Sequence, residues 1–209
     1  MALSTHTTTT GFLLPSIHSA PPFFTQQPHP ASLSIATEQW IQIILKYARH
    51  RRLFTVRVED SEALGNDWDE ILRNERINRK LIPSYLSYIL TQMVSQKLAV
   101  YEPPKQDRSI LIYWRLPEEW AEVLYEWVRL LGAPWFNSII HSQVSSTGNL
   151  NTIMTFYEIT DPPVESPLSG LPIPLLRQAI TLLSKSNRAQ IIAISEGEGV
   201  RFFPTTGKA

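Results

Sequence analysis

The 209-residue chain contains no cysteine. This absence excludes disulfides, thiol nucleophiles, iron–sulfur clusters and the usual structural zinc sites. Charged residues make up only 18% of the chain, and 19 basic side chains balance 19 acidic ones. Nucleic-acid affinity comes mostly from Lys and Arg that neutralise phosphates, so this balance argues against a dedicated nucleic-acid binder. The 43% of hydrophobic residues is typical of a globular protein.

Targeting and membrane-spanning segments are also missing from the sequence. Residues 1–10 contain neither Lys nor Arg, so they lack the positive flank of a signal peptide. No uncharged apolar run approaches the roughly 20 residues that a bilayer span requires. We therefore expect a cytoplasmic protein that reaches membranes only through its partners.

Motifs of catalysis are absent as well. The chain has no G-x-S-x-G element, no P-loop and no pair of histidines at metal-binding spacing. Three of its five histidines fall within residues 1–30. Gly197 and Gly199 are better explained by a hairpin turn than by a phosphate-binding loop. We expect no enzyme activity, no cofactor and no metal site.

Residues 1–30 contain five prolines and show neither a helical nor a strand period, which predicts a flexible, extended arm. Within it, Pro21, Pro22, Phe23 and Phe24 concentrate apolar surface that a solubilising tail would not need. Proline fixes φ, so the two rings could be presented at a low ordering cost. We expect both rings to stay outside the fold and to enter a pocket on a partner. Their replacement by alanine should then leave the fold intact.

The rest of the chain predicts two modules, residues 31–115 and 116–209, that share one order of elements. Each contains a helix, a strand, a loop, a helix that begins at a proline (Pro83 or Pro174), and two strands. This is the order of a winged helix. The predicted fold class is α+β and mostly helical, with two tandem winged-helix domains preceded by an extended proline-rich N-terminal arm.

The expected elements have these bounds. In the first module they are a helix over 37–52, a strand over 54–58, an acidic loop over 59–70, a short helix over 74–81, a helix from Pro83, and strands over 98–101 and 109–114. In the second they are a helix from Pro117, a linker or insertion over 133–151, a strand over 153–160, a helix from Pro174, and strands over 191–195 and 200–203.

A winged helix raises the possibility of DNA binding. Residues 83–96 contain no Lys or Arg, and the helix from Pro174 carries only Arg177 and Lys185. These cations are too few for the usual phosphate contacts, so a nucleic-acid-binding regulator is the weaker alternative. A ligand of WW-type domains ranks last, because Phe24 lacks the hydroxyl group of the tyrosine that those domains favour. Six Trp, seven Tyr and eight Phe favour protein recognition.

Five segments carry a specific resemblance. They are Pro-Pro-Phe-Phe-Thr-Gln-Gln-Pro at 21–28, Ile-Asn-Arg-Lys-Leu at 77–81, Leu-Ile-Tyr-Trp-Arg-Leu-Pro-Glu-Glu-Trp at 111–120, Phe-Tyr-Glu-Ile-Thr at 156–160, and residues 189–203. In this order they resemble the vacuolar protein-sorting-associated protein 25 family, the small subunit of the endosomal sorting complex ESCRT-II.

The resemblance implies a non-enzymatic adaptor and a set of partners. Two copies of such a subunit join one copy each of vacuolar protein-sorting-associated proteins 22 and 36. The Pro-Pro-aromatic segment, here Pro21, Pro22, Phe23 and Phe24, inserts into a groove on those subunits, and Arg79 lies at the same contact. The second domain recruits the ESCRT-III subunit vacuolar protein-sorting-associated protein 20. The family acts at the endosomal membrane, in sorting ubiquitinated cargo into multivesicular bodies.

Overall fold

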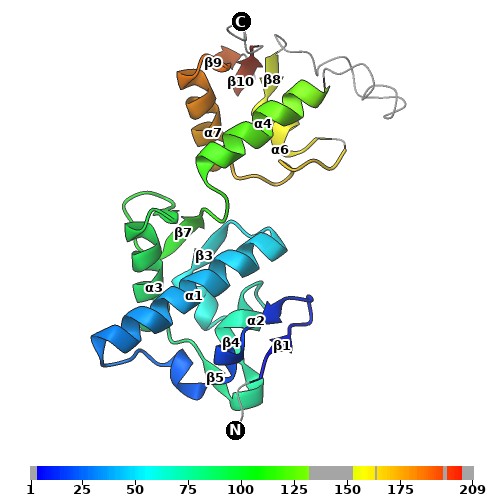
Figure 1. Cartoon of the computed structure of the whole chain (residues 1–209). Coiled ribbons are helices and arrows are strands. Elements are labelled where there is room, and N and C mark those ends of the chain that lie inside the picture. Colours follow the sequence, from blue (N-terminus) through cyan, green and yellow to red (C-terminus); the bar gives the residue numbers. More distant parts are fainter. Residues whose placement is uncertain (1–3, 132–152, 163, 195–196, 204–209) are drawn as a thin grey trace, which may run out of the picture. The chain divides into compact units, whose positions relative to one another are not determined.

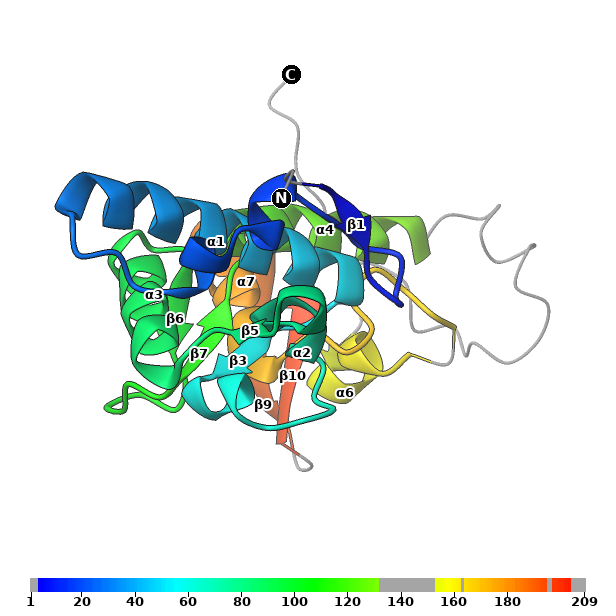
Figure 2. The same cartoon turned by 90° about the horizontal axis from the view of Figure 1, so that it is seen from below.

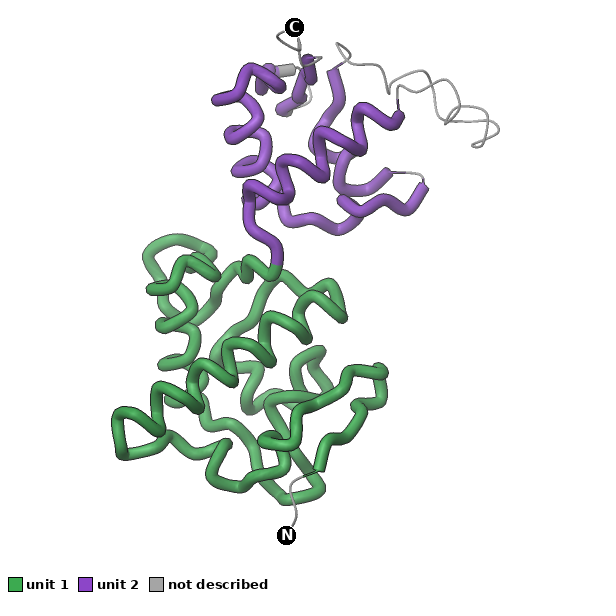
Figure 3. Tube along the Cα trace, viewed as in Figure 1, with its two compact units in different colours: residues 1–114 green, residues 115–209 purple. Residues whose placement is uncertain are grey.

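The computed structural model describes residues 4–131, 153–162, 164–194 and 197–203 (Figure 1). The chain divides into two compact units, residues 1–114 and 115–209 (Figure 3). The linker predicted over 133–151 lies outside the described residues.

Unit 1 is built on three helices and a three-stranded antiparallel sheet. The helices are α1 (Pro30–Arg51), α2 (Asp69–Leu72) and α3 (Pro83–Ser95), and the sheet strands are β3 (Thr55–Arg57), β6 (Ala99–Tyr101) and β7 (Ser109–Ile112). The order in the sheet is β3-β7-β6, so the last strand lies in the centre. Val56 pairs with Ile110, and Val100 pairs with Leu111.

Helix α3 begins at Pro83, as predicted, because proline has no N–H group to leave unpaired in a first turn. The buried side chains of α3 recur at helical spacing and are Tyr85, Leu86, Ile89, Leu90 and Met93. They join the side chains of α1, including Trp40 and Ile44, in one apolar core. Burial of this stripe, rather than helix propensity, holds the two helices together.

The short helix predicted over 74–81 is wrong. A hairpin stands there, made of β4 (Arg73–Asn74), the 3-10 turn η4 (Glu75–Ile77) and β5 (Arg79–Lys80). The side chain of Asn74 accepts a hydrogen bond from the backbone of Arg76, and Asn78 adopts a left-handed conformation with φ of 51°. Asparagine side chains compete for the backbone in this way, and here they favour the turn over a helix.

The flexible arm predicted for residues 1–30 is also wrong for residues 4–30, which pack on the rest of unit 1. They form β1 (His6–Thr7), β2 (Leu13–Leu14) and the 3-10 helices η1 (Ser16–Ser19) and η2 (Pro21–Phe24), the dark blue segment beside α1 in Figure 2. Leu14, Phe23 and Phe24 belong to the core. Helix α1 therefore starts at Pro30 and not at residue 37 as predicted, and Thr37 is buried within it.

Unit 2 repeats the order of unit 1. Its elements are α4 (Pro117–Leu131), β8 (Ile153–Thr155), α6 (Phe156–Thr160), α7 (Ile173–Lys185), β9 (Ala189–Ile194) and β10 (Gly197–Phe202). The sheet order is β8-β10-β9, again with the last strand in the centre. Helices α4 and α7 pack against each other. Both units thus have the element order of a winged helix, and the α+β class is confirmed.

The strand predicted over 153–160 is correct only for its first three residues. Thr155 ends β8 and caps α6: its hydroxyl oxygen accepts from the Glu158 N–H at 3.1 Å, while the Glu158 carboxylate accepts from the Thr155 N–H at 2.7 Å. This capping box starts a helix where the apolar pattern alone favours a strand.

Candidate protein-interaction site

The Pro-Pro-Phe-Phe segment forms η2, with its prolines exposed and its rings buried. Phe23 is 4% exposed and Phe24 is 2% exposed. The turn is closed by two backbone hydrogen bonds, from the Phe23 N–H to the Ala20 carbonyl at 3.0 Å and from the Thr25 N–H to the Pro22 carbonyl at 3.1 Å. A tight turn therefore separates an outward Pro-Pro face from two inward aromatic anchors.

Trp40 is the partner of both rings. The Phe23 ring stacks on it with centroids 4.5 Å apart, and the Phe24 ring meets it edge-on at 5.4 Å. The indole N–H of Trp40 also donates to the Phe23 carbonyl oxygen at 2.9 Å. The expectation that both rings stay outside their own fold is therefore wrong for this chain. The two phenylalanine rings lie only sixteen and seventeen residues before a buried tryptophan in the sequence, and they bury their apolar surface against it without a partner protein.

A buried histidine fixes the segment that precedes η2. His18 Nε2 lies 2.8 Å from the Ile71 carbonyl oxygen, while the Asn74 amide donates to the His18 carbonyl at 2.8 Å and lies 3.3 Å from His18 Nδ1. Burial lowers the pKa of His18 to about 4 and outweighs the Ile71 contact, which alone would raise it. A neutral ring with its proton on Nε2 satisfies both neighbours. His18 is not among the site residues predicted from the sequence, because it stands between Ile17 and Ser19 and no motif singles it out.

Arg79 lies on β5, and β5 lies beside η2. Its side chain is exposed and donates from Nη1 to the Asn78 carbonyl oxygen at 3.0 Å. The structure therefore places Pro21, Pro22 and Arg79 on neighbouring elements, and we call these three exposed residues the Pro-Arg face. A neighbouring pocket of about 510 Å³ is lined by the β4–β5 hairpin, namely Arg73, Asn74, Glu75, Asn78, Arg79 and Lys80.

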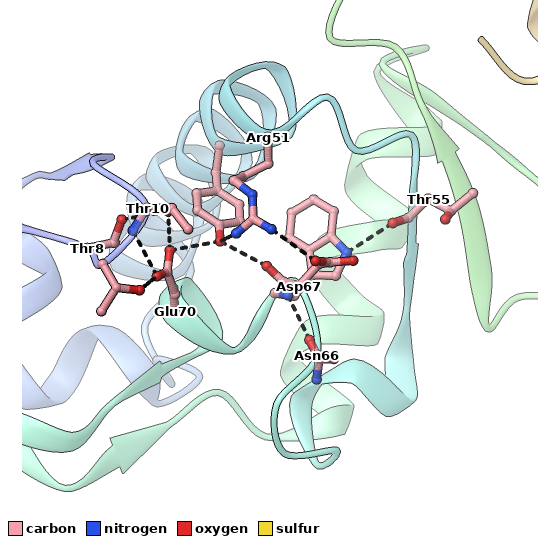
Figure 4. Close-up of polar contacts among 10 residues, drawn as sticks. Thr8, Thr10, Arg51, Thr55, Asn66, Asp67 and Glu70 are labelled. Atoms are coloured by element: carbon pink, nitrogen blue, oxygen red, sulfur yellow. Dashed lines mark hydrogen bonds and ion pairs between the residues drawn. The ribbon is translucent and has the colours of Figure 1, made fainter. Parts of the chain in front are cut away.

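Polar contacts in Figure 4 tie the N-terminal hairpin to α1 and α2. The Glu70 carboxylate accepts from the Thr10 N–H at 3.2 Å, from the Tyr47 hydroxyl at 3.0 Å, and from the hydroxyls of Thr9 and Thr10. Burial by itself raises the pKa of Glu70, but these hydrogen bonds outweigh it and lower the pKa to about 2. Glu70 is therefore charged at neutral pH and holds the β1–β2 turn in place.

Two arginines of unit 2, one on α7 and one just after it, are engaged in ion pairs. Arg177 pairs with Glu198, and Arg188 donates to Glu122 at 2.8 Å. Helix α3 contains no Lys or Arg, and Arg177 of α7 is already paired, so these two helices offer few cations for phosphate contacts. In the described residues, no helix is long and apolar enough to cross a membrane, and no cluster of His, Asp and Glu could hold a metal ion.

Comparison with known proteins identifies the family. The model of the family described as ESCRT-II complex subunit matches residues 17–134, more than half of the chain. The chain belongs to this family. The matched range contains the whole Pro-Arg face. The resemblance seen in the sequence is thereby confirmed.

Relatives of the ESCRT-II family extend the match along the chain. Vacuolar protein-sorting-associated protein 25 of Danio rerio is 28% identical over 194 residues, covering 92% of this chain and 99% of the relative. The protein of the same name from Drosophila melanogaster is 29% identical over 195 residues, covering 92% and 98%.

Solved structures show the same fold. The crystal structure of subunit VPS25 of the endosomal trafficking complex ESCRT-II has a TM-score of 0.69 at 22% identity, covering 90% of this chain and 98% of that one. The VPS22/VPS25/VPS36 complex structure of ESCRT-II contains a chain with a TM-score of 0.67 at 21% identity and the same coverage.

Proposed function

We propose that this protein is a non-enzymatic adaptor of ESCRT-II whose Pro-Arg face contacts subunits related to VPS22 and VPS36. One observation carries the proposal: Pro21, Pro22 and Arg79 are exposed on neighbouring elements of a chain that belongs to the ESCRT-II family. The family description is that of a complex subunit, and a solved relative is found in a complex with VPS22 and VPS36.

The buried rings have a different role from the one that the sequence predicts. Phe23 and Phe24 anchor η2 on Trp40, so the two prolines are held in one conformation before a partner arrives. A surface that is already ordered loses less conformational entropy on binding. The proline rings supply apolar contact area, and Arg79, which makes no ion pair among the described residues, supplies a charged group that orients the partner.

Co-purification tests the Pro-Arg face. The full chain carrying Pro21→Ala, Pro22→Ala and Arg79→Ala together is co-expressed with VPS22 and VPS36 subunits, and we expect at least a tenfold loss of affinity. Thermal unfolding should change little, because all three side chains are exposed. Arg49→Ala, which removes an exposed arginine near the end of α1, is the matched control. Wild-type affinity of the triple variant would contradict the proposal.

For unit 2 we propose recruitment of the ESCRT-III subunit vacuolar protein-sorting-associated protein 20, with two copies of the chain in each complex, during cargo sorting at the endosomal membrane. Exposed apolar side chains support a binding role for this unit, since Tyr157 is 69% exposed and Ile153 is 39% exposed.

The mass of the reconstituted complex tests the copy number. Binding of protein 20 to that complex, but not to VPS22 and VPS36 alone, tests recruitment.

A further inference from the structure

Strand β9 leaves one edge of the unit 2 sheet open. It is six residues long, Ala189–Ile194, and of the described strands it pairs with β10 alone. It contains no charged residue and no proline. Natural proteins usually protect such an edge with charge, proline, a bulge or a very short strand.

The register shows which backbone groups face outward. The Phe203 N–H donates to the Arg188 carbonyl at 2.9 Å, and the pairing continues from Phe202 opposite Ala189 to Gly197 opposite Ile194. Hydrogen-bonded and non-bonded pairs alternate in an antiparallel ladder. Ala189, Ile191 and Ala193 therefore direct their N–H and C=O groups away from β10. Among the described residues, these groups have no backbone partner.

The equivalent edge of unit 1 is protected. Strand β6 is only three residues long, Ala99–Tyr101. The Glu102 N–H donates to the Ser109 carbonyl, so Ala99 and Tyr101 face outward and the next outward position is Pro103. Proline has no N–H group, so it cannot extend the sheet. The same fold thus closes this edge in one unit and leaves it open in the other.

A groove of about 500 Å³ lies along the open edge. Thr181 and Ser184 of α7 form one wall, Ala189 and Ile191 of β9 form the other, and Phe203 also lines it. The hydroxyl oxygen of Ser184 is buried and has no hydrogen-bond partner in the part of the chain that the structure describes. A buried hydroxyl without a partner is costly, and the outward backbone groups of β9 are free to bond to an occupant of the same groove.

We propose that this groove receives an extended, uncharged peptide segment of a partner protein, which adds to β9 as a fourth strand. An extended backbone presents N–H and C=O groups at alternate positions, which is the spacing of Ala189, Ile191 and Ala193. The described groove lining carries no charge, so it offers no ion pair to a charged side chain.

A second copy of the chain fits this groove less well than a single strand. Antiparallel pairing of two β9 strands about Ile191 would relate the copies by a two-fold axis perpendicular to the sheet. Helix α7 borders the groove, so the α7 of the second copy would arrive on the same side of the joined sheet. A single peptide strand carries no helix, so it does not place a second helix on that side of the sheet.

The probe is a peptide selected from a displayed library of random eight-residue peptides by panning against the full chain. A synthetic copy of the selected peptide is then titrated by fluorescence anisotropy. Ile191→Pro removes one outward N–H group but no bond to β10, and edge strands tolerate such a proline. We expect it to weaken binding at least tenfold. Ile191→Val, which keeps the N–H, is the matched control and should remain within twofold of wild type.

Three results would overturn the proposal: no peptide enriched over a blank surface, equal binding by Ile191→Pro while circular dichroism shows an unchanged fold, or a dimer of the free chain that Ile191→Pro dissolves. The last result would assign the edge to a second copy. The assay contains no ESCRT-II subunit, so its outcome is independent of the Pro-Arg face.

Discussion

The aromatic rings of Phe23 and Trp40 are parallel to within 6°, and the Trp40 indole N–H donates to the Phe23 backbone carbonyl at 2.9 Å. One side chain of α1 thus holds both the ring and the backbone of η2. The conformation of the Pro-Pro segment is therefore determined inside unit 1. Phe23 therefore stabilises unit 1 directly. It contributes to partner binding only indirectly, by fixing the conformation of Pro21 and Pro22.

Phe23→Ala should lower the free energy of unfolding of unit 1 by about 3–5 kcal/mol, the usual cost of removing a buried phenylalanine. Hydrogen exchange of α1 peptides across a urea series measures this, with unit 2 peptides as an internal reference. Thr25→Ala, an exposed change just after η2, is the control and should stay within about 0.5 kcal/mol. A loss below about 1 kcal/mol for Phe23→Ala would show that the ring is not packed as described.

His18 should make unit 1 less stable in mild acid. Its folded-state pKa is lowered to about 4 from an ordinary value of 6.5. Between these values the unfolded chain binds a proton that the folded chain excludes, so the free energy of unfolding falls as the pH drops from 6.5 towards 4. The full shift corresponds to about 3 kcal/mol. Urea unfolding of unit 1 at pH 7, 6 and 5 measures the trend.

His18→Gln separates this effect from other titrations. The amide of glutamine can still donate to the Ile71 carbonyl but does not titrate. The free energy of unfolding of this variant should therefore vary less between pH 7 and 5 than that of the wild type. Glu70 does not interfere, because its lowered pKa means that its contribution is lost only below about 4.5. Parallel curves for wild type and His18→Gln would refute the assignment.

Glu70→Gln should release the β1–β2 turn without unfolding the unit. The variant keeps the size of the side chain but loses the charge that accepts from Thr9, Thr10 and Tyr47. Hydrogen bonds to a charged group contribute about 1.5–3 kcal/mol, so amide exchange in residues 8–14 should accelerate roughly tenfold or more. Glu62→Gln, an exposed change, should leave that exchange unaltered.

The starts of α3 and α4 were predictable from local chemistry, whereas the site was predictable only in part. Pro83 and Pro117 mark first turns regardless of the rest of the chain, and the apolar stripes that follow them are local patterns. The burial of Phe23 depends instead on Trp40, which the rings meet only after the chain folds back. The hydrophobic pattern within residues 1–30 does not indicate that contact, so the sequence of this segment looks like that of a free arm.

Arg79 illustrates the same limit. The resemblance to a family identified the residue, but a helix over 74–81 would have placed it differently. Its position beside η2 depends on the β4–β5 hairpin, which Asn74 and Asn78 form by turning the backbone. Short polar segments are decided by such side-chain hydrogen bonds, and these are weak signals in a sequence.

Thr155 offers a test of the boundary that the sequence analysis missed. Thr155→Ala removes the hydroxyl that accepts from Glu158 N–H, while Thr155→Ser keeps it. An N-cap is worth about 1 kcal/mol, so the alanine variant should lower the free energy of unfolding of unit 2 by that amount and the serine variant by much less. Hydrogen exchange across a urea series resolves the difference, with unit 1 peptides as the reference. Equal losses of stability in the two variants would mean that the capping box does not determine where α6 starts. Packing of the buried residues of α6, Phe156 and Ile159, would then be sufficient to form the helix.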